Sequence, residues 1–285
     1  LNEKIGKDVF TYREDIFKNK YARVFSTRRN NVPSKRIKSM MGSSDDDNTS
    51  CEAKVYLSKD LRNKIKNSEA FCFDVDSTLS VKEGLNELAY WCNGDDSLVN
   101  ILTEQAMNGE ITFRSALQYR LEYINPSRKD IFDFIDNNLP VLSDNAKRLI
   151  DILKQNKKDI HLISGGLHEL IIPIAEELNI PEKCIHANRL IFTNEGKYKD
   201  FDKKVYVSQE NGKSKTIKGL KKTYGYKNVV MIGDGITDLE IKSDKSDIFI
   251  GYGGVIVRKV IITDSDWFVY DFNEIAEIFK NSRNK

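Results

Sequence analysis

Two aspartates, Asp74 and Asp76, follow an apolar run that otherwise has the composition of a buried strand, in the stretch F-C-F-D-V-D-S-T-L-S. A carboxylate held at the end of a strand can attack a phosphoryl group and form an aspartyl phosphate, which divides hydrolysis into two easier steps. We therefore predict Asp74 as a nucleophile and Asp76 as the acid that protonates the leaving group and then activates water. If the extended backbone continues, its period of two places both side chains on the same side.

Polar residues also follow two later apolar runs. S-G-G comes after D-I-H-L-I, and G-D-G-I-T-D comes after N-V-V-M-I. In an open parallel α/β sheet, ligands bind beyond the carboxyl ends of the strands, so these residues are expected at one edge. The competing interpretation is that Asp74 and Asp76 cap the next helix and that the glycine-rich stretches are ordinary turns. The residues expected to converge are Asp74, Asp76, Ser164, Gly165, Gly166, Lys213, Asp234, Thr237 and Asp238.

Several carboxylates that face one crevice repel one another unless a cation or protonation relieves them, which weakens the interpretation as simple turns. A site of oxygen ligands favours Mg²⁺. We predict that Asp74, Asp234 and the backbone carbonyl of Asp76 bind the metal, with Asp238 as a further ligand or as the partner of one. The groups predicted to neutralise the phosphoryl oxygens are Lys213, Ser164 and the backbone N–H groups near Gly165 and Gly166.

The elements that would position these residues alternate along the chain from Glu69 onward. Amphipathic helices are predicted over 144–157, 167–178 and 213–224, although Pro173 should kink the second helix or confine it to its first turns. Five apolar runs are continuous rather than alternating, which is typical of parallel strands buried on both faces, so the fold class is α/β. These predicted strands are 70–75, 159–164, 228–233, 247–251 and 267–270.

Three segments depart from this alternation. Residues 84–138 carry helical stripes and no strand signal, which predicts a helical insertion after the first strand. Residues 187–206 are predicted to form a hairpin that turns at 194–196. Residues 1–41 hold 11 Lys/Arg against 4 Asp/Glu and precede a polar, linker-like run. This basic segment has the composition of either an Asn/Lys-rich extension or an organelle transit peptide, and the first interpretation is preferred.

The overall composition excludes several classes of protein. The 285 residues are 40% hydrophobic and 31% charged with a net charge of +2, so a folded protein without a global nucleic-acid or membrane footprint is expected. The four cysteines lack a CxxC pair, and they are predicted to be reduced thiols in a reducing compartment. The predicted location is therefore the cytoplasm, with targeting to an organelle through the N-terminal extension as the alternative.

Four stretches, D-V-D-S-T, L-I-S-G-G, G-K-S-K and M-I-G-D-G-I-T-D, resemble in order and spacing the four motifs of the haloacid dehalogenase-like superfamily, and in particular of its phosphoserine phosphatase family. The similarity runs from about Glu69 to Phe272. It implies a Rossmann-like three-layer core, a small helical cap inserted after the first strand, and a small β-hairpin. It also implies Mg²⁺-dependent hydrolysis of O-phospho-L-serine to L-serine and phosphate, the last step of phosphorylated serine biosynthesis.

The resemblance further implies a set of substrate-binding residues. Glu83 would bind the substrate ammonium and Arg120 its carboxylate, while Met107 would line the pocket beside Asn108. A zwitterion independently requires one acid and one guanidinium, which grips a carboxylate with two hydrogen bonds. From the residues alone, the preferred interpretation is that Glu83 is an acid at a helix N-terminus and that Arg120 is half of a surface pair near Glu122. The residues implied to hold phosphate or substrate are Ser164, Gly165, Gly166, Lys213 and Thr237, with Arg258 near the site.

The predicted organisation is an N-terminal extension over 1–68, a phosphatase core over 69–83 and 140–285, and a helical cap over 84–139. Two other functions stay open: a phosphatase for a different small phosphomonoester, and a binding protein that keeps the fold as a scaffold and works through its basic N-terminus. The partner expected is the small-molecule substrate, without nucleic acid or membrane. A homodimer is one open assembly state.

Overall fold

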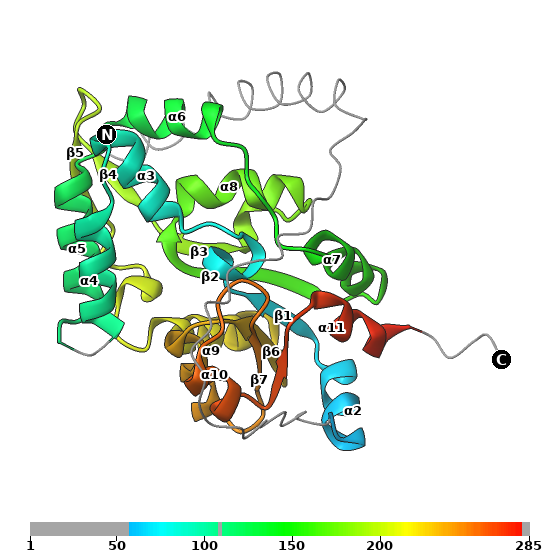
Figure 1. Ribbon diagram of the computed structural model, residues 1–285. Coiled ribbons are helices and arrows are strands. Elements are labelled where there is room, and N and C mark those ends of the chain that lie inside the picture. Colours follow the sequence, from blue (N-terminus) through cyan, green and yellow to red (C-terminus); the bar gives the residue numbers. More distant parts are fainter. Residues whose placement is uncertain (1–56, 108–109, 281–285) are drawn as a thin grey trace, which may run out of the picture. The chain divides into compact units, whose positions relative to one another are not determined.

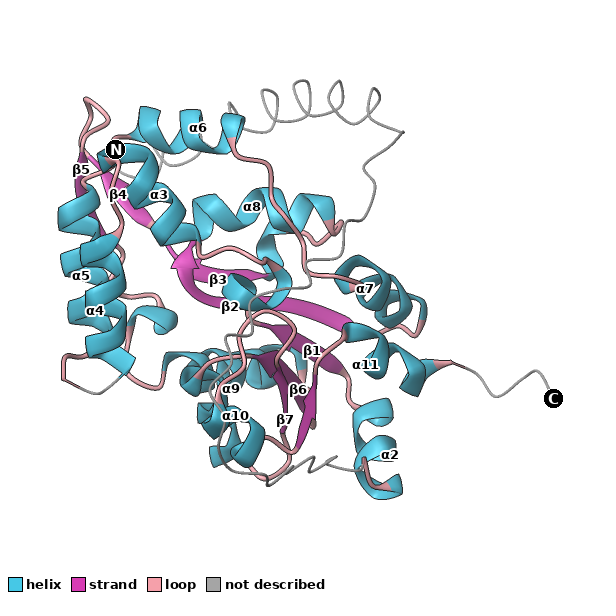
Figure 2. Cartoon of the chain, in the orientation of Figure 1, coloured by secondary structure: helices cyan, strands magenta, loops and turns pink. Residues whose placement is uncertain are grey.

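The sheet at the centre of the protein has six parallel strands in the order β3-β2-β1-β6-β7-β8. The computed structural model describes residues 57–107 and 110–280, and of Met107 it describes the backbone alone (Figure 1). Figure 2 shows the parallel strands fanning across the middle of the core. The strands are β1 (Ala70–Phe73), β2 (Asp159–Leu167), β3 (Ile185–Asn188), β6 (Val229–Gly233), β7 (Ile248–Tyr252) and β8 (Trp267–Val269).

Both faces of this sheet are buried, which explains the continuous apolar runs. On β1, Phe71 and Phe73 belong to one apolar cluster, whereas Ala70 and Cys72 belong to another on the opposite face. The first cluster contains residues of α2 (Lys59–Asn67), α7 (Ala146–Gln155), α8 (His168–Glu177) and α11 (Phe272–Phe279). The second contains residues of α9 (Gly212–Tyr224) and α10 (Lys259–Asp264). These three layers confirm the predicted α/β class.

Between β1 and α7, the described residues form four helices that make up the predicted helical insertion (Figure 1). Thr112 and Ser127 cap α5 and α6 with their hydroxyl groups, each accepting a hydrogen bond from the N–H of the third helical residue. The chain enters and leaves the insertion through two segments that pair with each other, because Val81 donates its N–H to Val141 and Ser143 donates its N–H to Leu79. The four helices are α3 (Gly84–Asn93), α4 (Ser97–Met107), α5 (Phe113–Ile124) and α6 (Arg128–Asn137).

The hairpin prediction was right about the turn and wrong about the start. Strands β4 (Leu190–Phe192) and β5 (Tyr198–Phe201) pair in antiparallel fashion around a turn in which Gly196 has φ 81°. Residues 187 and 188, however, belong to β3, a parallel strand at the edge of the main sheet. A four-residue edge strand with the sequence I-H-A-N lacks the apolar run that marks the central strands.

Two further local expectations differ from the structure. Pro173 lies in the middle of α8, and the helix continues past it to Glu177 instead of being confined to its first turns. Strand β1 ends at Phe73 rather than continuing through Asp76, because the chain turns at once into one irregular helical turn, Val75–Leu79. Within this turn Ser77 has the left-handed backbone angle φ 53°.

The division into extension, core and cap stays a prediction. Residues 1–56, which hold the basic segment and the polar run, lie outside the described residues. Helix α2 falls within the predicted extension, yet its Ile65 is fully buried in the larger apolar cluster. Among the described helices, none has the length and apolarity that a membrane span requires. Cys72, Cys92 and Cys184 are free thiols.

Two histidines on neighbouring strands, the buried His161 and the half-buried His186, form a cluster with Tyr226. His186 Nε2 lies 3.3 Å from His161 Nδ1, and His161 Nε2 lies 3.2 Å from the Tyr226 hydroxyl, which donates to Asp159 at 2.6 Å. Burial lowers the pKa of His186 from 6.5 to about 4, and it also lowers the pKa of His161. Both rings are therefore neutral in the folded protein at neutral pH.

This cluster makes the fold sensitive to acid. As the pH falls below 6.5, the unfolded chain takes up a proton at His186 that the folded chain refuses until about pH 4. We expect the free energy of unfolding to fall by about 2 kcal/mol between pH 7 and pH 5 through this residue alone. Urea unfolding at both pH values measures it. His186→Leu should remove that part of the pH dependence, and an unchanged difference between the two pH values would contradict the assignment.

Candidate active site

A buried ion cluster joins β1 to α9 and to the loop after β6. The Lys213 Nζ lies 2.9 Å from Asp74 Oδ2 and 2.6 Å from Asp238 Oδ1, and Asp238 Oδ2 accepts the N–H of Gly235 at 2.9 Å. Burial alone would lower the pKa of Lys213, but the two carboxylates raise it above its ordinary value. The Asp74 main chain is fixed by its N–H, which donates to the Ile232 carbonyl at 2.9 Å. Strand pairing therefore holds Asp74 rigidly at the sheet edge.

Asp234 follows β6 and lies in the same cluster. Thr78 donates to Asp234 Oδ1 at 3.2 Å, and Arg258 contacts Asp234 Oδ2 at 3.2 Å through a terminal nitrogen. Burial and the charge of Asp74 raise the pKa of Asp234 to about 6, and Arg258 works against that rise. This ion pair places Arg258 near the site, as the resemblance implied.

The donor atoms of this cluster fit a divalent cation. Ligand oxygens of Asp74, Asp234 and Asp238 all lie within 4.8 Å of one another, and all three residues are buried. Burial raises the pKa of Asp238 well above its ordinary value, and the charge of Asp74 adds to the rise. Together with Asp76, four acids face two cations, Lys213 and Arg258, so negative charge is left over. An all-oxygen set with excess negative charge suits a hard divalent ion.

Asp76 reaches the same pocket from the irregular turn after β1. Its Oδ1 accepts the N–H of Gly84 at 2.8 Å, and its Oδ2 lies 3.5 Å from the Ser164 hydroxyl. A Cβ atom at Gly166 would lie only 2.7 Å from Asp76 Oδ2, so glycine is needed there for the carboxylate to fit. Burial, with Glu83 and Asp74, raises the pKa of Asp76 to about 7. Asp76 can therefore hold or release a proton near neutral pH.

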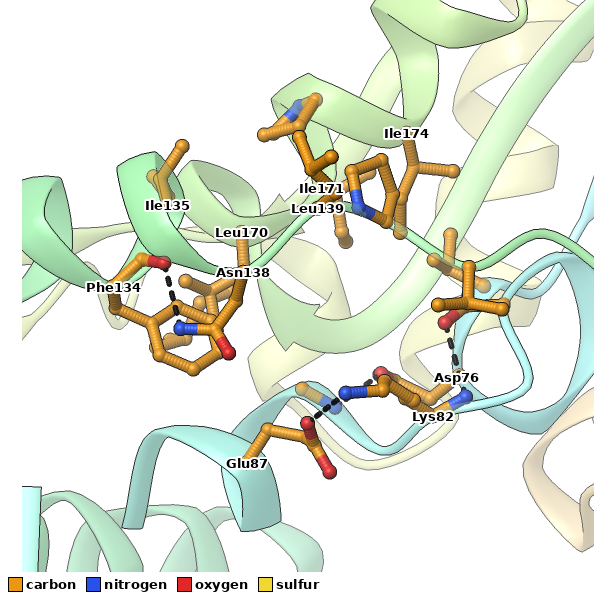
Figure 3. Close-up of a pocket in the computed structure, with 17 residues that line it drawn as sticks. Asp76, Lys82, Glu87, Phe134, Ile135, Asn138, Leu139, Leu170, Ile171 and Ile174 are labelled. Carbon is orange, nitrogen blue, oxygen red and sulfur yellow. Dashed lines mark hydrogen bonds and ion pairs between the residues drawn. The ribbon is translucent and has the colours of Figure 1, made fainter. Parts of the chain in front are cut away.

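Asp76 also borders a small, mainly apolar cavity (Figure 3). This cavity, of about 60 Å³, is lined mainly by apolar side chains, among them residues of α6 and α8. Leu170, Ile171 and Ile174 belong to that lining, and the ion pair of Lys82 with Glu87 also borders it. Low polarity behind a carboxyl group disfavours its charged form.

A second cavity, of about 150 Å³, opens over the aspartates and is roofed by the helical insertion. Glu83 and Arg120 both line it. Arg120 is only 8% exposed and donates to the Ala116 carbonyl at 3.2 Å and to the Thr103 hydroxyl at 3.3 Å, so it is not the surface partner of Glu122. Burial lowers the pKa of Arg120 to about 10, which leaves it cationic at neutral pH.

Glu83 precedes α3 but does not cap it with its side chain. Its carboxylate instead accepts a hydrogen bond from the Ser77 hydroxyl, and the acid that accepts the first N–H of the helix is Asp76. Arg120 is therefore not a surface arginine, whereas Glu83 does stand at a helix N-terminus, and the acid and the guanidinium line the same cavity. An acid and a guanidinium can hold the two charges of an amino acid.

The structure brings together twelve of the fourteen predicted site residues. Asn108 and the side chain of Met107 lie outside the described residues. The sequence interpretation missed Thr78, which contacts Asp234, and Phe113, whose ring occupies the space above Gly165, where an added Cβ would lie 2.7 Å from Phe113 Cζ. Thr78 stands inside the D-V-D-S-T motif, which was the available signal. Other cavity residues without such a signal are Leu85, Thr103 and Ala106.

Comparison with known proteins decides the family. A model described as haloacid dehalogenase-like hydrolase matches residues 69–241. The chain belongs to the haloacid dehalogenase-like hydrolase family. This haloacid dehalogenase-like hydrolase is 39% identical over 225 residues to the chloroplastic phosphoserine phosphatase of Arabidopsis thaliana, covering 79% of this chain and 76% of that protein. It is 38% identical over 216 residues to phosphoserine phosphatase of Bos taurus, covering 76% and 95% respectively.

A solved structure supports the same assignment for the fold of this haloacid dehalogenase-like hydrolase. The structure described as a phospho-aspartyl intermediate analogue of phosphoserine phosphatase matches with a TM-score of 0.63 and 25% identity, over 75% of this chain and 99% of that chain. The predicted family and the predicted α/β architecture are thereby confirmed.

Proposed function

We propose that this protein is a phosphoserine phosphatase, which hydrolyses O-phospho-L-serine to L-serine and phosphate. The observation that carries the proposal is one cavity that combines Asp74 and Asp76 with a zwitterion-binding pair, Glu83 and Arg120. The relatives named as phosphoserine phosphatases, at 38–39% identity, support the same substrate. Because this reaction releases free serine from its phosphorylated precursor, it would be the last step of phosphorylated serine biosynthesis.

In the first half of the reaction, a carboxylate oxygen of Asp74 attacks phosphorus and the bond from phosphorus to the serine oxygen breaks. Asp76 gives its proton to that oxygen, so neutral serine hydroxyl leaves. The pKa of Asp76 near 7 supports this role, because the group can carry the proton before the attack. Asp74 then bears the phosphoryl group as an acyl phosphate.

In the second half, the Asp76 carboxylate takes a proton from water as the water oxygen attacks phosphorus. The bond from phosphorus to Asp74 breaks, which frees inorganic phosphate and restores both carboxyl groups. The hydrogen bonds of Asp76 to Gly84 and Ser164 support this proton transfer, since they hold its two oxygens in place. The apolar lining of the cavity beside Asp76 supports a raised pKa for this carboxyl group.

Charge on the transferred phosphoryl group must be neutralised throughout. Lys213, the Ser164 hydroxyl and the backbone N–H groups near Gly165 and Gly166 are the groups proposed for this, with Thr237 beside them at the cavity wall. Asp74 and Asp234, two members of the buried oxygen cluster, would hold Mg²⁺. The backbone carbonyl of Asp76 is proposed as a further ligand, and bound Mg²⁺ would supply positive charge to the phosphoryl oxygens. Asp238 has both oxygens occupied by Lys213 and Gly235, which supports a role in orienting Lys213.

The proposal is tested by measuring phosphate release from O-phospho-L-serine with and without Mg²⁺. The same measurement on an uncharged aryl phosphate gives the comparison substrate. The intact protein should require Mg²⁺ and prefer phosphoserine. Arg120→Ala should lower kcat/KM for phosphoserine roughly 10- to 100-fold, because a charge-assisted carboxylate contact is lost, and should change aryl phosphate hydrolysis little. Equal losses on both substrates would contradict the selector role. A clear preference for another phosphomonoester would show that the proposed substrate is wrong, while the proposed phosphatase chemistry would still hold.

For location, the proposal is the cytoplasm, based on the free thiols of the described residues. The alternative is targeting through residues 1–68, and the Arabidopsis relative, which is named as chloroplastic, supports that alternative. The proposed partner is the small-molecule substrate.

A further inference from the structure

An arginine at the start of α5 ties the helical insertion to the core. Arg114 Nε donates to the Ser208 carbonyl at 3.0 Å, and a terminal nitrogen donates to the Lys203 carbonyl at 3.2 Å and lies 3.4 Å from the Ser208 hydroxyl. The guanidinium thus donates hydrogen bonds to two residues of the segment that precedes α9, Lys203 and Ser208. The function described above uses none of these contacts.

The segment that Arg114 grips is itself packed tightly against α9. Ser208 is fully buried, and its hydroxyl donates to the Val205 carbonyl at 2.8 Å. At Gly212, the first residue of α9, an added Cβ would lie 2.5 Å from the Tyr206 carbonyl oxygen, so the helix start is pressed onto this segment. The next residue is Lys213. A rigid path of contacts therefore leads from Arg114 to the lysine that pairs with Asp74.

On the other side, Arg114 is fixed to the part of α5 that faces the substrate cavity. Its neighbour Phe113 covers Gly165, and Arg120 lies two turns further along the same helix. The Phe113 ring centroid is 6.0 Å from the Arg120 guanidinium carbon. A helix is stiff over two turns, so anchoring its first turn sets the position of Arg120 relative to the core.

We infer that Arg114 is a positioning residue that sets the spacing between Arg120 on the insertion and Lys213 on the core. This inference rests on the proposed function, in which these two cations hold the carboxylate and the phosphate at opposite ends of one substrate. An aryl phosphate without a carboxylate does not span the two groups. Arg114 therefore matters for phosphoserine and not for phosphate esters in general.

The experiment compares Arg114→Ala with a matched control, Arg128→Ala, in the full-length protein. Arg128 is another arginine at the start of an insertion helix, and its side chain packs on the Phe192 ring of the hairpin, away from the cavity. For Arg114→Ala we expect kcat/KM on phosphoserine to fall about tenfold, mostly through KM, as the loss of one or two net hydrogen bonds predicts. In Arg114→Ala, the kinetic constants for the aryl phosphate and the melting temperature should change little. In Arg128→Ala, the kinetic constants for both substrates should be unchanged.

Arg114→Lys sharpens the comparison. A lysine keeps the charge but has no planar fork, so it can restore one of the two carbonyl contacts and should recover only part of the KM. An unchanged KM for phosphoserine in Arg114→Ala, or equal losses on both substrates, would overturn the inference.

Hydrogen exchange separates failure of the inference from failure of the proposed function. If the parent protein hydrolyses the aryl phosphate but not phosphoserine, the proposed substrate is wrong, and exchange at residues 113–117 and 206–210 still tests the anchor. Arg114→Ala should speed exchange in both segments and Arg128→Ala in neither. Unchanged exchange in Arg114→Ala would reject the anchor itself.

Discussion

Replacement of Asp74 by asparagine is expected to lower phosphate release by at least about 10⁴-fold on every phosphate ester. The amide has nearly the same shape, but it cannot form an acyl phosphate, so both halves of the reaction are lost. Acid-quenched turnover followed by intact-mass measurement should show one added phosphoryl group on the parent protein and none on Asp74→Asn.

The fold should survive this change. Asparagine keeps the volume and removes one charge from a crowded set of carboxylates, so the melting temperature should stay close to that of the parent protein. Turnover by Asp74→Asn above about 1% of the parent rate, with a phosphoryl group trapped on another residue, would show that the nucleophile lies elsewhere.

Lys213→Ala should damage both activity and stability. Lys213 is 5% exposed and pairs with Asp74 and Asp238, so its loss leaves two buried carboxylates without their cation. Breaking such a buried pair costs about 3–5 kcal/mol. Loss of a cation that stabilises the transferred phosphoryl group should lower kcat roughly 10²- to 10³-fold. Urea unfolding and phosphate release measure the two effects.

Lys221→Ala is the matched control for this prediction. Lys221 lies on the same helix and pairs with Asp244 and Asp247 at 2.8 and 2.9 Å, but it is remote from the aspartates of the site. The Lys221→Ala variant should be less stable than the parent protein, but each folded molecule should turn over substrate at the parent rate. Mg²⁺ should stabilise Lys213→Ala more than Lys221→Ala, because both variants keep the proposed metal ligands but only Lys213→Ala lacks the cation that neutralises Asp74 and Asp238. Equal responses of the two variants to Mg²⁺ would argue against a cation site beside Lys213.

Much of the fold and of the candidate active site could be predicted, because the sequence around the end of a parallel strand carries two signals. One is the apolar run of the strand, and the other is the polar residue that follows the run. A buried parallel strand needs a continuous apolar run, and Asp74 and Asp234 stand directly after such strands. Ser164 follows the apolar residues of β2, but the strand continues past it to Leu167. Strand β3 could not be predicted in this way, since an edge strand of four residues has few buried positions. The position of Asp76 also depended on a turn with a left-handed residue, Ser77, which an extended backbone does not anticipate.

The substrate-facing residues were harder to predict from the sequence. Phe113, Thr103 and Ala106 lie on amphipathic helices, where an apolar or small residue facing a cavity has the same spacing as one facing the core. Arg114 has no sequence signature either, because its partners are backbone carbonyls 89 and 94 residues away. Glu83 and Arg120 were assigned by family resemblance, and only the fold brings them to one cavity.

The paired segments at Val81 and Val141 give the insertion a modular character. Because its two ends leave the sheet side by side, α3 to α6 form a cassette that can be exchanged without altering the order of the strands. Evolution or an engineer can therefore change which molecule is admitted while the aspartates stay where they are. The part of selectivity that depends on Arg120 is in this sense encoded on a separate stretch of the gene from the aspartates.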